Sequence, residues 1–177
     1  QEILRSKSLD RNSYDSGDWF NRLDHTLEDN GFGAGLPSER DNKDHWAVMK
    51  PLLAASTGIK PTKAEIAWTR DAFLDLLRIR ASSSLFRLRT ADDVARRLSF
   101  HNTGPSQVPG VLLAQLDGSG LPGANFQELV LLINADAAPQ TVTVGALAGK
   151  RYTPHPVHRA AAAADARVAT ATYTPAS

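Results

Sequence analysis

The hydrophobic positions along the chain change their spacing near residue 89, from helical to alternating. Before that point, an apolar stripe at helical spacing predicts one long helix within residues 61–84: Ile66, Phe73, Leu76, Leu77 and Ile79. Thr62 with Glu65 three residues later forms a capping box, which predicts where this helix begins. Thr90 and Asp93 repeat the capping pattern and predict a second, shorter helix.

The first 58 residues are rich in loops, because glycine, proline, Asn and Asp recur throughout them. One short helix is predicted from Asp44, where apolar residues have helical spacing, and Pro51 should kink or shorten it. Irregular stretches of this length in compact domains are usually functional. The N-terminal region is therefore where we look first for a site.

After residue 89, six short runs with apolar or alternating patterns predict β-strands: 97–102, 110–118, 127–135, 140–147, 151–158 and 167–174. Gly, Pro and Asn separate the runs at roughly ten-residue intervals, which is typical of a β-sandwich. Helices followed by strands in blocks, without alternation of the two, predict two modules. We expect loops and helices in residues 1–89 and an all-β unit in residues 90–177.

The composition and net charge bear on which kinds of partner the chain could bind. With 177 residues, of which 42% are hydrophobic and 22% charged, the chain can bury a core. The net charge of +1 and the scattered basic residues give no indication of nucleic acid, and no apolar run approaches the roughly 20 residues of a membrane helix. We therefore expect neither nucleic acid nor a membrane as a partner. The start at Gln1, with neither Met nor a signal-peptide pattern, suggests a piece of something longer.

Metal ions and nucleophilic catalysis find little support. Oxygen ligands spaced like those of a calcium loop begin at Asp10, but Asp15 and Asn21 stand where an EF-hand needs Gly and a bidentate Glu. Cysteine is absent, the five histidines are dispersed, and no serine elbow motif is present. The glycines of residues 31–35 lack the strand and helix of a dinucleotide loop. We expect no metal ligands and no cofactor in this chain, although a calcium site of another kind stays open.

The loop from Ser8 to Asp24 mixes carboxylates, arginines and asparagines with aromatic side chains. Sugar rings have apolar C–H faces that stack on aromatics and hydroxyl rims that take directional hydrogen bonds, so the mixture suits a carbohydrate. A glycosidase also needs two carboxyl groups, and Asp15 and Asp18 are of the right type. A loop that packs its own aromatics, or a protein interface, explains the same composition.

Three motifs of the chain are long and specific: "SYDSGDWFN" (13–21), "SLFRLRTA" (84–91) and "SFHNTGP" (99–105). With them, residues 1 to about 157 resemble the C-terminal part of pullulanase-type debranching enzymes, the bacterial pullulanases and plant limit dextrinases of the α-amylase superfamily. The resemblance implies a parent enzyme that hydrolyses α-1,6-glucosidic bonds in pullulan, starch or limit dextrins with retention of configuration. It implies α-glucan as the substrate and calcium as a possible cofactor of the parent.

The resemblance also implies the fold, an α+β fragment with the last loop and helix of a (β/α)8 barrel followed by an all-β C-terminal sandwich. Residues 5–46 would be the loop after strand eight, and the remainder of the barrel would be a partner. The family's catalytic carboxylates lie on earlier strands, so no catalytic residue and no hydrolysis are expected of this chain alone. Because family members usually end with a further strand, the sandwich is expected to lack its closing strand and to expose an edge.

By matching position, the resemblance implies that Arg11 and Asp44 hydrogen-bond a glucosyl unit next to the cleaved bond. The alternative is an ion pair that ties the loop together. Six other side chains are expected to brace the loop: Tyr14, Asp15, Asp18, Trp19, Phe20 and Asn21. Phe32 stands where the family often has Trp. For the β half, a stabilising module is favoured over a non-catalytic carbohydrate-binding module, because its aromatics lie mostly in apolar runs.

Overall fold

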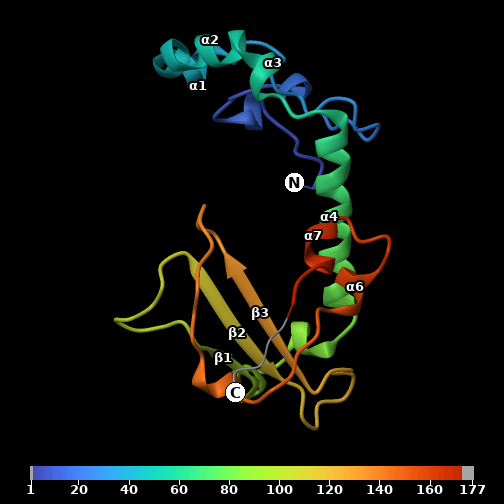
Figure 1. Cartoon of the computed structure of the whole chain (residues 1–177). Coiled ribbons are helices and arrows are strands. Elements are labelled where there is room, and N and C mark those ends of the chain that lie inside the picture. The colour runs from blue at the N-terminus through green and yellow to red at the C-terminus, as the bar shows by residue number, and fades with distance from the viewer. Residues whose placement is uncertain (1, 173–177) are drawn as a thin grey trace. The chain divides into compact units, whose positions relative to one another are not determined.

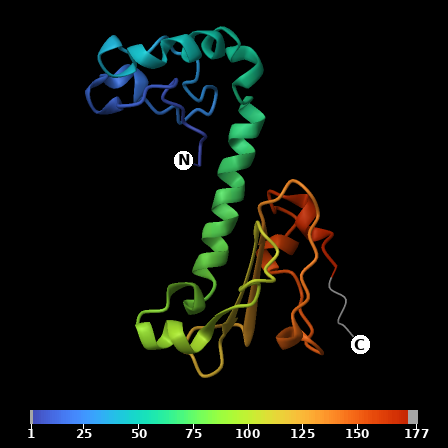
Figure 2. The ribbon, with the colours of Figure 1, turned by 90° about the vertical axis from the view of Figure 1, so that its left-hand side faces the viewer.

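The computed structural model describes residues 2–172 and divides the chain into two compact units, Gln1–Leu74 and Asp75–Ser177 (Figure 1). The division falls within helix α4 (Lys63–Ala81), which Figure 2 shows as one continuous helix. The predicted boundary near residue 89 concerns the modules of a parent protein and stays a prediction. None of the helices in residues 2–172 is long and apolar enough to cross a membrane.

The first unit consists of irregular loops and short helices. Its elements before α4 are the 3-10 turns Ser13–Asp15, Asp18–Phe20 and Lys43–His45 and the helices α1 (Glu39–Asn42), α2 (Trp46–Ala54) and α3 (Ser56–Ile59). Helix α2 confirms the helix predicted from Asp44, and Pro51 lies inside it. Because proline has no N–H to donate to the preceding turn, it weakens the helix at this point.

The predicted capping box at the start of α4 is confirmed, and Thr90 caps the next helix as its pattern predicted. At the start of α4, the Glu65 N–H donates to Thr62 Oγ1 at 3.3 Å, and the Thr62 N–H donates to the Glu65 carboxylate at 2.7 Å. At α5 (Ala91–Arg97), the Asp93 N–H donates to Thr90 Oγ1 at 3.0 Å. Each cap satisfies N–H groups that the first helical turn leaves without a partner.

The burial along α4 differs from the expected stripe. Ile66 is buried, at 1% exposure, but Leu76 is 59% exposed. Asp75 is charged, yet it is buried, and it accepts hydrogen bonds from the Ala164 N–H at 2.8 Å and from Arg78 at 2.7 Å. The periodicity predicted the helix, but it did not predict which face the neighbouring residues cover.

The second unit contains a three-stranded antiparallel sheet in the order β1 (Leu98–Phe100), β2 (Val111–Asp117) and β3 (Glu128–Asn134). These strands confirm the first three predicted runs. Residues opposite each other across the strands share a face. One face contributes Leu116 to a core with Leu85 and Ala124, and further apolar residues pack against this core: Phe86, Leu88, Leu98, Leu121 and Leu129.

The other three predicted strands do not form in the described residues. Residues 140–147 are irregular and end in a 3-10 turn, and the segments after them contain the short helices α6 (Pro156–Arg159) and α7 (Ala166–Ala169). Pro156 suits the first helical turn, and the Asp165 carboxylate caps α7 by accepting from the Arg167 N–H. The unit is thus a small sheet with helices, and the expected sandwich is not seen.

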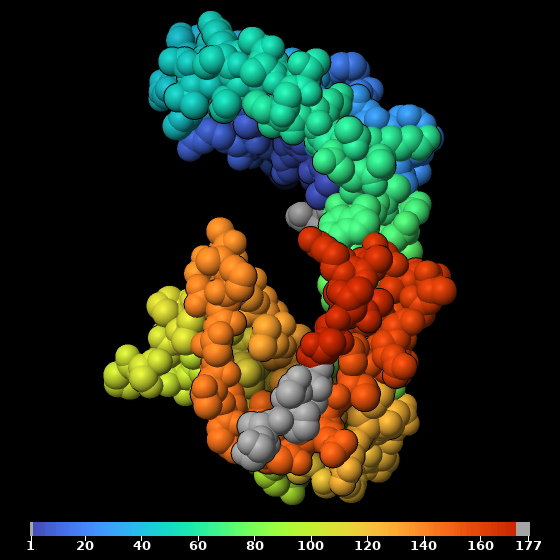
Figure 3. All heavy atoms as spheres, in the orientation of Figure 1, coloured from blue at the N-terminus to red at the C-terminus, as the bar shows by residue number. Residues whose placement is uncertain are grey.

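Helices α6 and α7 cover the C-terminal part of α4 within the second unit (Figure 3). The last residues of the final predicted strand, 173 and 174, lie outside the described residues, and the expected absence of a closing strand stays a prediction.

Candidate functional site

The two residues implied to bind substrate lie on segments that a single side chain joins. Asn42, the last residue of α1, is fully buried and accepts a hydrogen bond from the Arg11 backbone N–H at 3.0 Å. Its amide group donates to the Asp10 carboxylate at 2.9 Å and to the Ser38 carbonyl at 3.0 Å. Asp44 lies in the 3-10 turn directly after Asn42. The loop that carries Arg11 is therefore fixed against the segment that carries Asp44.

Both candidate side chains are exposed. Among residues 2–172, no hydrogen bond or ion pair involves the Arg11 guanidinium or the Asp44 carboxylate, so the alternative of an ion pair between them is not formed there. An unpaired cation and anion at the surface suit an external polar ligand, because neither must first give up an internal partner.

Next to Arg11 in the sequence, the Asp10 carboxylate is 8% exposed and is held by neutral groups. One oxygen accepts from the Asn42 amide at 2.9 Å, and the other accepts from the Ser16 hydroxyl at 2.7 Å. Buried carboxylates are costly unless such hydrogen bonds satisfy them. Asp10 and Asn42 therefore depend on each other.

Several of the residues expected to brace the loop make contacts of that kind. The Trp19 indole N–H donates to the Ala34 carbonyl at 2.8 Å, and the Arg22 guanidinium lies 4.7 Å from the centre of the Trp19 ring. The Asn21 amide donates to the Ser13 carbonyl at 2.6 Å. These contacts connect turns of the loop that lie eight to fifteen residues apart.

The remaining expected braces differ among themselves. Asp15 forms an ion pair with Arg40, the Asp18 backbone carbonyl accepts from the Asn21 N–H, and Phe20 is half-buried. Tyr14 is 97% exposed, so among residues 2–172 its ring has almost nothing to pack against and does not brace the loop. The pattern that grouped Tyr14 with the other aromatics did not show on which side of the turn it stands.

Two carboxylates, Asp24 and Asp29, are held by hydrogen bonds from groups nearby. Hydrogen bonds, first from the Thr26 hydroxyl, lower the pKa of Asp24 to about 2. A hydrogen bond from Lys60 at 2.5 Å is the main cause that lowers the pKa of Asp29 below its ordinary value of 3.8. A groove of about 300 Å³ lies beside them, lined by Arg22, Leu23, Asp24, Asp29 and Gly31.

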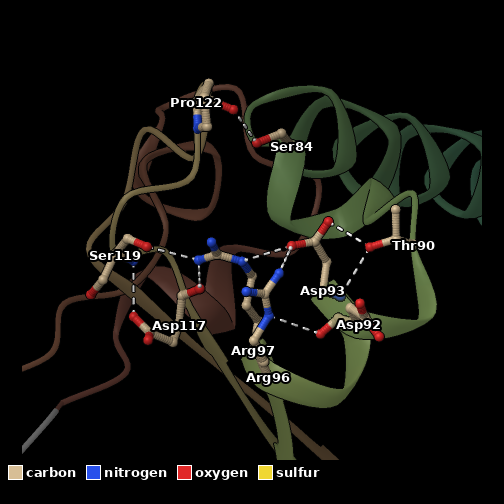
Figure 4. A network of polar contacts seen from close by, with 9 residues as sticks. All are labelled: Ser84, Thr90, Asp92, Asp93, Arg96, Arg97, Asp117, Ser119 and Pro122. Carbon is tan, nitrogen blue, oxygen red and sulfur yellow. Dashed lines mark hydrogen bonds and ion pairs between the residues drawn. The ribbon is translucent and has the colours of Figure 1, made fainter.

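In the second unit, a polar network joins α5 to the turn between β2 and β3 (Figure 4). Arg97 donates to the carbonyls of Asp117 at 3.2 Å and Ser119 at 2.8 Å, and its Nε lies 3.5 Å from the Asp93 carboxylate. Arg96 also reaches Asp93, at 3.2 Å. The residues involved pair with one another, which indicates a structural role.

Ser82 and His155 lie within hydrogen-bond distance, with 3.1 Å between Oγ and Nε2. His155 Nδ1 accepts from the Val157 N–H at 3.2 Å, so the neutral ring carries its proton on Nε2 and donates it to Ser82. Ser82 in turn donates to the Ile79 carbonyl at 2.7 Å. His155 therefore does not act as a base toward Ser82. Burial, together with the nearby His158, lowers the pKa of His155 below 6.5.

Within residues 2–172, no three His, Asp or Glu side chains gather as they would around a metal ion.

Comparison with known proteins defines the class. Residues 27–177 match the family model described as α-1,6-glucosidases, pullulanase-type, C-terminal. Because this match covers most of the chain, the chain belongs to that family, as the resemblance of its motifs indicated.

Individual relatives are pullulanases. The chain is 44% identical over 163 residues to pullulanase 1, chloroplastic, of Arabidopsis thaliana, covering 88% of the chain and 17% of the relative. It is 36% identical over 154 residues to the pullulanase of Klebsiella pneumoniae, covering 84% of the chain and 14% of the relative. The chain thus spans about one sixth of the length of these relatives.

Solved structures that resemble the chain are also pullulanases. PulA from Klebsiella oxytoca superposes with a TM-score of 0.76 at 34% identity, covering 89% of the chain and 15% of that protein. The Klebsiella pneumoniae pullulanase complexed with maltotriose superposes with a TM-score of 0.75 at 33% identity, with the same two coverages.

Asn42 is the residue of this site that sequence reasoning missed. Its contacts reach residues 31 and 32 positions away, and no local periodicity or capping motif marks such a contact.

Proposed function

We propose that the chain is the C-terminal portion of a debranching glycoside hydrolase that cleaves α-1,6-glucosidic bonds in pullulan, starch or limit dextrins. The observation that carries the proposal is the 44% identity to pullulanase 1 over 88% of the chain. The maltotriose complex of a structural relative supports an α-glucan as the ligand.

Within that enzyme, Arg11 and Asp44 hydrogen-bond a glucosyl unit beside the cleaved bond. The guanidinium donates to sugar hydroxyl oxygens and the carboxylate accepts from hydroxyl groups, which fixes the sugar in one orientation. Their exposure and lack of internal partners in the described residues support this role. The sheet and the helices of the second unit stabilise the catalytic part of the enzyme.

The chemistry itself belongs to the remainder of the enzyme. A retaining glycosidase needs one carboxylate as nucleophile and one carboxyl group as acid and base, about 5–5.5 Å apart. We place neither in this chain, and Asp15, which pairs with Arg40, is not offered for the task. The isolated chain is therefore inactive, and release of reducing sugar from pullulan by the purified chain would contradict this.

The role of the two binding residues is tested in the complete enzyme with Arg11→Ala and Asp44→Ala. Losing one hydrogen bond to a charged group costs roughly 1.5–3 kcal/mol, so kcat/KM for pullulan should fall about 10- to 100-fold. Asp41→Ala, which removes a carboxylate from the neighbouring helix α1, serves as the matched control and should stay within about twofold. Unchanged kinetics in both variants, with unchanged thermal stability, would assign Arg11 and Asp44 to structure alone.

A further inference from the structure

We propose that Asn42 is a positioning residue that holds Arg11 in register with Asp44 for substrate binding. The inference rests on the proposed function, because it concerns the same site. It goes beyond the binding residues by naming the buried group through which they are arranged.

The side-chain amide of Asn42 uses both of its donors and its oxygen in hydrogen bonds to nearby residues. It is fully buried, its oxygen accepts from the Arg11 N–H, and its two amide hydrogens go to Asp10 and Ser38 at 2.9 and 3.0 Å. An amide has two donors and one acceptor oxygen, so the group has little freedom to turn. A residue held in this way transmits its own position to its neighbours in the chain.

These bonds act on the main chain of Arg11 rather than on its side chain. Fixing the Arg11 N–H fixes where the exposed side chain begins, while the guanidinium stays available to a ligand. Asp44 lies two positions after Asn42, in the 3-10 turn Lys43–His45. Asn42 thus sets the separation of two side chains that lie 33 positions apart in the sequence.

The site requires an amide and not a carboxylate. In Asn42→Asp, an oxygen replaces the donor that faces the Asp10 carboxylate at 2.9 Å and the Ser38 carbonyl at 3.0 Å. Two carboxylates would then share one buried site, where like charges disfavour each other. Size and shape change little, so the variant tests the hydrogen bonds rather than the packing.

Asn30 provides a matched control in the same unit. It is 8% exposed, donates to the Leu4 carbonyl at 3.1 Å and accepts from the Phe32 N–H at 3.0 Å. It therefore resembles Asn42 in burial and in bonding to the backbone, but it makes no bond to Arg11 or to residues 38–45.

The experiment measures kcat and KM for pullulan in the complete enzyme carrying Asn42→Asp, Asn42→Ala or Asn30→Ala, with thermal unfolding of each variant. We expect both Asn42 variants to lose about tenfold or more in kcat/KM at a temperature where they are folded, and Asn30→Ala to stay within about threefold. Asn42→Ser, which retains a small polar group, replaces any Asn42 variant that does not fold.

A double-mutant cycle distinguishes positioning from general stability. If Asn42 acts through Arg11, then Asn42→Ala should have little further effect in a chain that already carries Arg11→Ala. Effects that multiply in the double variant, or equal losses in the Asn42 and Asn30 variants, would overturn the inference. A wild-type enzyme that does not hydrolyse pullulan would overturn the proposed function itself, which is a separate result.

Discussion

The core beneath the sheet allows a stability prediction with a built-in comparison. Leu85 is 2% exposed and packs with Leu116 and Ala124, whereas Leu132 on β3 is 60% exposed. Replacing a fully buried Leu by Ala costs about 2–5 kcal/mol, because apolar contacts are lost and a cavity is left. The same change at Leu132 removes side-chain area that is mostly in water already, so it should cost less than about 1 kcal/mol.

The consequence for unfolding is large in a unit of this size. A small domain is stable by only about 5–15 kcal/mol, and each kcal/mol lowers Tm by roughly 4–8 °C. Leu85→Ala should therefore lower the Tm of the second unit by at least about 8 °C, and Leu132→Ala by a few degrees.

These shifts in stability can be measured by urea and thermal unfolding of the purified chain, with far-ultraviolet circular dichroism as the signal. The three Trp residues, at positions 19, 46 and 68, all belong to the first unit, so their fluorescence serves as an internal control that should move little. If Leu132→Ala destabilises the chain as much as Leu85→Ala, or if the shift appears in the Trp signal alone, the assignment of the core is wrong.

Two further predictions concern the second unit. An Ala at Gly118 would place its Cβ against the Phe126 carbonyl, so Gly118→Ala should cost roughly 1–3 kcal/mol, while Gly145→Ala, with open space around it, should be close to neutral; comparing their urea midpoints tests this. His155 has a lowered pKa, so the folded state binds fewer protons at this ring than the unfolded state, and the stability it contributes is present above pH 6.5 and is lost as the pH falls below that value. The wild-type chain should lose stability between about pH 7 and 5.5, and His155→Gln should lose less; equal slopes for the two chains would show that another group is responsible.

Features defined by near neighbours in the sequence were predictable. The capping box of Thr62 and Glu65 and the helix cap of Thr90 each involve residues three positions apart, and both form. The first three strands were predicted from apolar runs separated by turns, and they pair in sequence order, which is the simplest antiparallel arrangement.

The strand predicted at residues 140–147 does not form, and it shows which information an alternating pattern does not contain. Val142 and Val144 are half-buried and Thr141 and Thr143 are exposed, so the alternation did predict which side chains face inward. A strand, however, also needs a neighbouring backbone for its hydrogen bonds, and alternation specifies no such partner. In the next segment, Pro156 favoured a helical start over a continued strand.

The candidate site was accessible from the sequence only through motif resemblance. Arg11 and Asp44 have no feature of their own that separates them from other surface charges. Asn42 was not found at all, since its burial follows from contacts that exist only in three dimensions.

The sequence separation of those contacts also affects the order in which parts of the molecule fold. The capping boxes close within three residues, whereas the bonds of Asn42 to Arg11 and Asp10 close loops of 31 and 32 residues and so cost more chain entropy. Helical turns form early during folding, and such loops close later. During synthesis, Arg11 leaves the ribosome well before Asn42 does, so the Arg11 backbone N–H lacks its acceptor until then. The surface proposed to hold the sugar is thus complete only after two segments 31 positions apart have both been made.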